Sequence, residues 1–207
     1  MKRFVQIRRR TARANSAIRF LHGNEGAALV EFAIVLPLLV VFITGIYDFG
    51  GAFNQRQKIE QAAQEGAIVA GAQPTSDFSP VAGQISNPDS LLPVATAVIN
   101  SLAGSGVLTA SCSASNKGHG PSPALTWTYK ITGCSSAYPN DALVITINRG
   151  WVAATSTAEL DVVGTMVTVT FPYHWRFNSV IQLLIPGNST FQAVTSVTEI
   201  ATVHNQM

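Results

Sequence analysis

Charged residues are scarce in this 207-residue chain, at 12%. Soluble globular proteins carry about twice that share, so the composition is typical of an exported, membrane-tethered protein. The sequence also lacks the H-E-x-x-H spacing of zinc hydrolases, the G-x-S-x-G of serine hydrolases and a phosphate-binding loop. We therefore expect no catalytic residues, no metal and no cofactor, and we expect that the protein is not an enzyme.

Cysteine is nearly absent, with Cys112 and Cys134 as the two examples. Both follow a long apolar run, so they reach an oxidising compartment if the N-terminus stays in the cytoplasm, and a disulfide is the default there. Such a bridge contributes roughly 3 kcal/mol in the chain-entropy model. The alternative is a metal site with His119, but two cysteines and one histidine leave the fourth ligand of zinc unassigned. The sequence favours the disulfide.

Acidic residues are almost missing before Gly26, where Glu25 opposes seven of the chain's 13 lysines and arginines. Beyond Gly26, six basic residues face ten acidic ones, a net charge of −4. A basic cluster directly before an apolar run indicates a cytoplasmic N-terminus. The alternative, nucleic-acid binding, has no RNA- or DNA-reading motif to support it. We interpret residues 1–26 as a cytoplasmic leader and expect no nucleic-acid partner.

One apolar run dominates the sequence: GAALVEFAIVLPLLVVFITGIY, from Gly26 to Tyr47. Its last 21 residues, 27–47, span roughly 31 Å as a helix, which matches the hydrocarbon core of a bilayer. The alternative, a buried helix of a soluble domain, seldom needs this length. Pro37 lacks an amide proton and frees the carbonyl of Ala33, so it predicts a kink that is either simply tolerated or shapes packing in an assembly.

The helical pattern continues beyond the run, with apolar and alanine positions at helical spacing as far as Ala72 and Pro74 as the terminator. Gly50 and Gly51 weaken the join, either as a hinge or as a place of close packing. The predicted organisation is a leader (residues 1–26), an N-terminal helix (27–73) with its membrane span at 27–47, and an exported domain (74–207).

In the predicted exported domain, apolar and polar residues alternate as they do in β-strands. We expect a short second helix at residues 91–101, which starts either at Leu91 or after Pro93. We expect strands at 106–112, 125–132, 142–147, 162–171 and 191–203. The predicted class is α+β, pilin-like in layout: a long N-terminal transmembrane and amphipathic helix followed by a small antiparallel sheet. The apolar segment 180–186 either covers the sheet or touches the membrane surface. Five aromatic residues favour a core or sheet edge over a sugar-binding surface: Trp127, Tyr129, Trp151, Tyr173 and Trp175.

The head of the apolar run carries a motif, since Gly26 is followed at the fifth and sixth positions by Glu31 and Phe32. This G-x-x-x-x-E-F form resembles the prepilin signature of type IV pilin-like proteins. More specifically, RFLHGNEGAALVEFAIVLPLLVVFITGIYDFG resembles the opening of the TadE-like family of the tight-adherence (Flp) pilus system. The resemblance covers about residues 19–72, and the rest of the chain matches only in general layout.

The resemblance implies cleavage between Gly26 and Ala27 by a prepilin peptidase, which makes Glu31 the fifth residue of the mature chain. A carboxylate inside a membrane helix costs on the order of 3 kcal/mol. The new ammonium of Ala27, from the same chain or a neighbouring subunit, offsets this cost, since a charge pair at ~4 Å gains about 4 kcal/mol at an effective dielectric near 20. The alternative is that Glu31 snorkels at the cytoplasmic edge.

Together with these features, the resemblance implies a minor pilin-like protein, or pseudopilin, of the tight-adherence pilus, with a role in adhesion and biofilm formation. Its predicted partners are the prepilin peptidase, other pilin-like subunits, pilus-assembly membrane proteins and membrane lipid. Its predicted location is the bacterial inner membrane, as a single-pass protein with the N-terminus inside and the C-terminal domain exported, or the pilus after assembly. The assembly residues are Glu31 and Pro37. The alternative function is a permanently anchored, exported binding module for glycans, cell wall or a protein partner.

Overall fold

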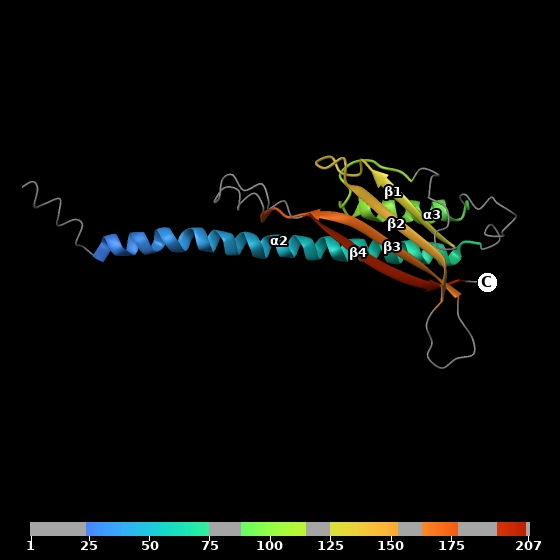
Figure 1. Cartoon of the computed structure of the whole chain (residues 1–207), viewed down its shortest axis with the longest axis horizontal. Coiled ribbons are helices and arrows are strands. Elements are labelled where there is room, and N and C mark those ends of the chain that lie inside the picture. Colours follow the sequence, from blue (N-terminus) through green and yellow to red (C-terminus); the bar gives the residue numbers. More distant parts are fainter. Residues whose placement is uncertain (1–23, 75–87, 115–124, 153–162, 178–193, 206–207) are drawn as a thin grey trace, which may run out of the picture.

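We describe the fold from a computed structural model, which places residues 24–74, 88–114, 125–152, 163–177 and 194–205. The elements within these ranges are, in order, α2 (Asn24–Ala72), α3 (Leu91–Gly104), β1 (Thr126–Thr132), β2 (Ala142–Val152), β3 (Val163–His174) and β4 (Val194–His204) (Figure 1). A long helix comes first and an antiparallel sheet follows, so the predicted α+β class is confirmed.

Helix α2 is one continuous element of 49 residues, which corresponds to about 74 Å. Its first half projects beyond the other labelled elements, and its second half lies along the sheet (Figure 1). The helix continues through Pro37 and through Gly50 and Gly51, and it ends at Ala72 as predicted. Among the described residues, it is the one helix with the length and apolar composition to cross a membrane.

The second half of α2 belongs to the hydrophobic core. Its buried side chains recur every three or four residues and are mostly small: Ile59, Ala62, Ala63, Ala67 and Ala70. Gly66 lies among them, and a Cβ atom there would come within 2.5 Å of Val98 Cγ2 and 3.4 Å of Val167 Cγ1. Small residues on this face therefore let α2 pack closely against α3 and β3 at the same level.

Helix α3 buries one apolar face, with side chains at helical spacing: Leu91, Val94, Ala95, Val98, Ile99 and Leu102. The sequence predicted this helix at residues 91–101, and the structure extends it to Gly104. Pro93 lies within the first turn, where the missing amide proton has no intrahelical partner to lose. The helix therefore starts before Pro93 rather than after it.

The four strands form an antiparallel sheet in the order β1-β2-β3-β4. Alternate side chains of each strand face the helices, and the central ones are fully buried: Trp127, Leu143, Ile145, Ile147, Val167 and Val169. The other face carries threonines that pair across strands, with Thr128 Oγ1 and Thr146 Oγ1 3.2 Å apart. This pattern of one apolar and one polar face is typical of an antiparallel sheet covered on one side.

One strand prediction was wrong. Residues 106–112 form turns and coil, because their apolar side chains seal the end of α3 instead of pairing in the sheet. Gly106 has φ +73°, and the amides of Val107 and Leu108 both donate to the carbonyl of Leu102. This geometry closes the C-terminus of a helix, and Leu108 is buried there.

The other strands differ from prediction at their ends. β2 continues to Val152 and β3 to His174, past the predicted ends at residues 147 and 171. The predicted segment 180–186, the first residues of the predicted last strand and leader residues 1–23 lie outside the described ranges.

The C-terminus of α2 is held by a buried arginine from the sheet. Arg149 on β2 donates to the carbonyl of Ala70, to that of Gln73 at 3.0 Å and to that of Pro74 at 3.3 Å. A cation at this position satisfies terminal carbonyls and opposes the negative end of the helix dipole. The last turn of α2 has no basic residue of its own, so the sheet supplies the missing charge.

Candidate functional site

The predicted processing residues lie together at the start of α2. Gly26, Ala27, Glu31 and Phe32 occupy its first turns and are all exposed. Among the described residues, no side chain or other element lies within 4 Å of a Cβ built on Gly26. Ala27 and Glu31 are four residues apart, which puts their side chains on one face of the helix. The segment is thus accessible, and the geometry allows the predicted pairing between position 27 and the carboxylate.

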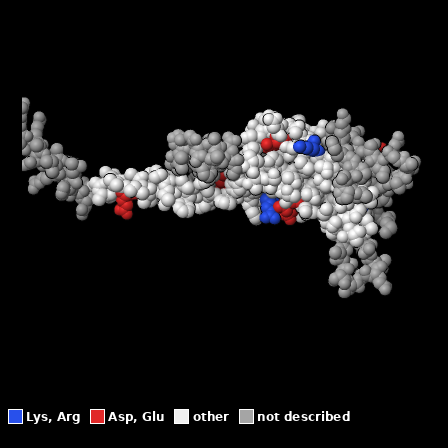
Figure 2. All heavy atoms as spheres, in the orientation of Figure 1, with Lys and Arg blue, Asp and Glu red and all other residues white. Residues whose placement is uncertain are grey.

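The projecting part of α2 presents an almost uncharged surface. Figure 2 shows it as nearly white with one acidic patch, and Glu31 is the charged residue of positions 27–47. None of these 21 side chains is buried, and Leu29, Ile34 and Ile46 are each about 70% exposed. An apolar surface of this length is covered by lipid or by other helices rather than by water.

Pro37 lies in this part without ending the helix, and it is half-buried. Thr44, further along the helix, makes its hydrogen bond within the helix: its Oγ1 donates to the carbonyl of Val40 at 2.8 Å. A hydroxyl group that hydrogen-bonds within its own helix needs no water, which suits a segment surrounded by lipid.

Immediately after the apolar run, a buried carboxylate joins α2 to the sheet. Asp48 is 1% exposed. Its Oδ1 accepts a hydrogen bond from Tyr173 Oη at 2.9 Å, and its Oδ2 accepts one from the amide of Phe177 at 2.7 Å. Burial of the phenol, together with the hydrogen bond to Asp48 and its charge, raises the pKa of Tyr173 to about 12. The end of β3 is therefore tied to the point where the apolar run ends.

Gly51 provides the space for this contact. A Cβ atom at Gly51 would lie 2.8 Å from Tyr173 Oη, whereas one at Gly50 would meet nothing within 4 Å. Of the two roles open for this pair, close packing applies to Gly51, and α2 remains helical through both residues. The role of Asp48 as an anchor was not predicted from the sequence. The signal was an acidic residue directly after the apolar run, with a glycine one turn later.

Aromatic rings gather beside this junction. Trp175 packs edge-on against Phe49, with ring centroids 5.2 Å apart, and against Tyr173 at 5.1 Å. The indole Nε1 of Trp175 donates to Thr195 Oγ1 at 2.8 Å. Trp127 and Tyr129 are buried in the core, as expected of aromatic residues in a small sheet. Tyr173 and Trp175 instead connect the sheet to the long helix.

A hollow of about 970 Å³ opens between α2, the β1–β2 connection and the end of β3. His174 lines it, stacked on Tyr138 with centroids 3.5 Å apart and paired through Nε2 with Asp141 Oδ2 at 2.7 Å. Lys58 and Arg176 also line the hollow. Within the described ranges, no group of three or more histidine, cysteine, aspartate or glutamate side chains is arranged to hold a metal.

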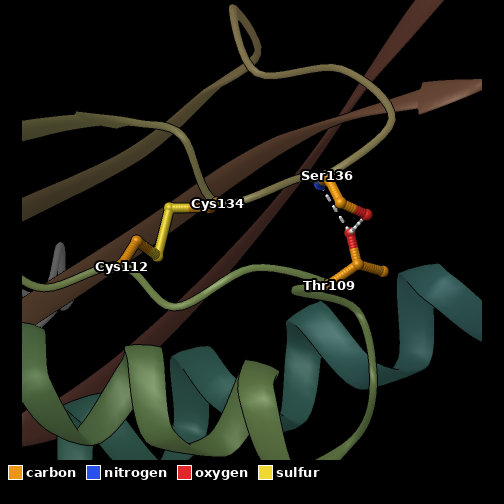
Figure 3. Close-up of a disulfide and its surroundings, with 4 residues drawn as sticks. All are labelled: Thr109, Cys112, Cys134 and Ser136. Carbon is orange, nitrogen blue, oxygen red and sulfur yellow. Dashed lines mark hydrogen bonds between the residues drawn. A yellow bond between two sulfur atoms is a disulfide. The ribbon is translucent and has the colours of Figure 1, made fainter.

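The two cysteines form the predicted disulfide (Figure 3). The bridge joins the segment after α3 to Cys134, two positions beyond the end of β1. Thr109 Oγ1 accepts a hydrogen bond from the amide of Ser136 at 2.9 Å, and the amides of Thr109 and Ala110 donate to the carbonyl of Cys134. His119, the third member of the alternative metal site, lies outside the described residues. The bridge is therefore structural and holds this segment against the sheet.

Comparison with protein families found a match on the helix. Residues 26–67 match the family described as TadE-like protein. The resemblance predicted from the motif is confirmed for this TadE-like segment (residues 26–67), which contains the exposed apolar half of α2 and most of its buried alanine face. No curated protein and no solved structure matches the chain.

The match covers 42 of the 207 residues, so it shows similarity to the TadE-like family for this part of α2. The match begins at Gly26, the residue on which the predicted processing motif starts. It stops before the sheet, so the folded domain that α2 carries is described by the structure alone.

Proposed function

We propose that this protein is a minor pilin-like subunit, or pseudopilin, of the tight-adherence pilus. The observation that carries the proposal is the position of the TadE-like match: it starts at Gly26 and covers an exposed apolar half-helix joined without a break to a folded domain. Such an arrangement suits a protein that works by packing its helix, first in the membrane and then against other subunits.

The proposed precursor is cut between Gly26 and Ala27 by a prepilin peptidase at the cytoplasmic face of the inner membrane. The basic leader holds residues 1–26 inside, residues 27–47 span the bilayer, and residues 74–207 are exported. The disulfide between Cys112 and Cys134 supports the orientation, because such bridges persist outside the cytoplasm.

Assembly is proposed to use Glu31 and Pro37. Cleavage creates an α-ammonium on Ala27, and Glu31 of the same or a neighbouring subunit pairs with it in a medium of low dielectric. Glu31 is exposed on the helix, so a neighbouring helix can reach it. Pro37 leaves the carbonyl of Ala33 without its helical donor, which gives an adjacent helix a polar group to contact.

Substitution at the cut site tests the proposal. We expect that Gly26→Leu, co-expressed with the peptidase, keeps its leader, because the bulky side chain prevents the peptidase from reaching the bond to Ala27. Gly45→Ala is the matched control, since Gly45 lies on the same helix with open space around it, and it should be cut normally. A wild-type chain that retains its leader would instead support the permanently anchored binding module.

A further inference from the structure

The aromatic rings at the junction lie at a defined height along α2. Phe49 and Phe53 follow the last residue of the span, Tyr47, by two and six positions, which places them about 3 and about 9 Å further along the axis. The polar interface of a bilayer is roughly 5–7 Å thick on each side. Both rings are largely exposed, at 69% and 61%. Phe49 lies within this layer. The Cα of Phe53 lies about 2 Å beyond it, but side chains of a helix tilt towards its N-terminus, so the Phe53 ring points back towards the layer.

The folded domain brings further rings to the same height. Trp175 follows the end of β3 and packs on Phe49, and its indole N–H is held by Thr195 at the start of β4. A hollow of about 230 Å³ opens between these elements, lined by Phe49, Ala52, Phe53, Arg56, Tyr173, Trp175, Thr195 and Val197. These residues give the domain a largely apolar surface beside the helix, which we call its foot.

The chemistry of this foot suits a lipid interface. Tryptophan and tyrosine rings are enriched at headgroup level, where one end of the ring is apolar and the other is polar. The polar atoms of Trp175 and Tyr173 are satisfied by Thr195 and Asp48, so both rings are held in fixed positions. Arg176, the next residue, is exposed, and a cation here favours anionic headgroups.

We propose that Phe49, Phe53, Tyr173 and Trp175 form an aromatic collar that inserts into the headgroup layer of the outer leaflet. The domain would then rest on the membrane that its own helix spans, in a fixed orientation. This inference builds on the proposed function, because it takes residues 27–47 as the membrane span. Continuity of the collar with that span selects lipid as the occupant rather than a separate protein partner.

Tryptophan fluorescence of the full chain in nanodiscs, with one chain per disc, tests the collar. The discs contain phosphatidylcholine and phosphatidylglycerol brominated near the glycerol end of the acyl chains, where bromine quenches nearby indoles. We expect quenching in the wild-type chain, loss of most of it in Trp175→Phe, and no such loss in Trp151→Phe. Trp151 pairs with Gly164 at the opposite end of β3, about 30 Å from Tyr173.

A second pair of variants tests the helix side of the collar. Phe53→Ser should reduce the quenching of Trp175, since it removes an exposed ring from the foot. Ile68→Ser is the matched control, because Ile68 is also exposed on α2, at 68%, but lies about 22 Å further along the axis. It should leave the quenching unchanged.

The outcomes separate the collar from the proposed function. If the chain enters the disc but its quenching is unaffected by Trp175→Phe, the collar is wrong and the membrane span stands. The same conclusion follows if quenching is absent with one chain per disc, because the rings then avoid the lipid even where no other subunit competes for them. If the chain does not enter the disc at all, both the proposed membrane span and the proposed collar are wrong.

Discussion

The phenol of Tyr173 donates a hydrogen bond to the carboxylate of Asp48, 125 positions earlier in the chain, with 2.9 Å between Oη and Oδ1. Tyr173 lies near the end of β3 and Asp48 directly follows the apolar run of α2. The contact fixes the folded domain at the exit of the proposed membrane span. A helix that packs with other subunits would thereby carry its domain as a rigid attachment.

Removing this hydroxyl should loosen the junction. Tyr173→Phe leaves a buried carboxylate with one donor fewer, and hydrogen bonds to charged groups contribute about 1.5–3 kcal/mol. We expect the free energy of unfolding of the domain to fall by that amount. Denaturant unfolding of the full chain in detergent micelles, followed by tryptophan fluorescence, measures it. Tyr138→Phe, at an exposed ring, should change it little.

The pH dependence of the same variant provides an internal check. Because the pKa of Tyr173 is raised to about 12, from an ordinary value near 10, the folded chain keeps a proton that the unfolded chain loses. The contribution to stability is complete below about pH 10 and declines as the pH rises towards 12. Wild type should therefore lose stability more steeply over this range than Tyr173→Phe. Parallel curves would show that the phenol is not buried against the carboxylate.

Two adjacent glycines should respond in opposite directions to the same substitution. Gly51→Ala places a Cβ 2.8 Å from Tyr173 Oη, so we expect a destabilisation of about 1–3 kcal/mol from overpacking. Gly50→Ala meets open space and should stabilise the helix by roughly 0.5–1 kcal/mol. Thermal unfolding of both variants measures the difference. Equal effects would mean that α2 and β3 do not approach at Gly51.

Glu31 should matter for assembly and not for insertion. We expect Glu31→Gln to reach the membrane normally but to assemble at least tenfold less well, since losing about 1.4 kcal/mol of charge pairing already has that effect. Glu31→Asp keeps the charge and should recover part of the yield. The measurement compares sheared and membrane fractions of cells. Unchanged assembly of the glutamine variant would show that the carboxylate has no role in it.

The sequence predicted the parts of the fold that depend on local pattern. The helix to Ala72 and the strand at Thr126–Thr132 follow from periodicity over a few turns or residues. The anchors at Asp48 and Arg149 were missed because their partners lie more than 70 positions away. The false strand at 106–112 arose because apolar side chains that seal a helix end show the same alternation as a strand.

The residues of the candidate site also divide into those that a local pattern predicts and those whose roles depend on distant contacts. The motif at Gly26, Glu31 and Phe32 is local, and the TadE-like match falls on it. The role of Gly51 could not be derived in advance, because it depends on a tyrosine brought to the helix by the third strand of the sheet.

The mass of the chain purified from its native membrane tests the central claim most directly. Our account predicts a chain that begins at Ala27 and carries the bridge between Cys112 and Cys134, recovered with the membrane or the pilus. A full-length mass that still includes the arginine-rich leader would contradict it.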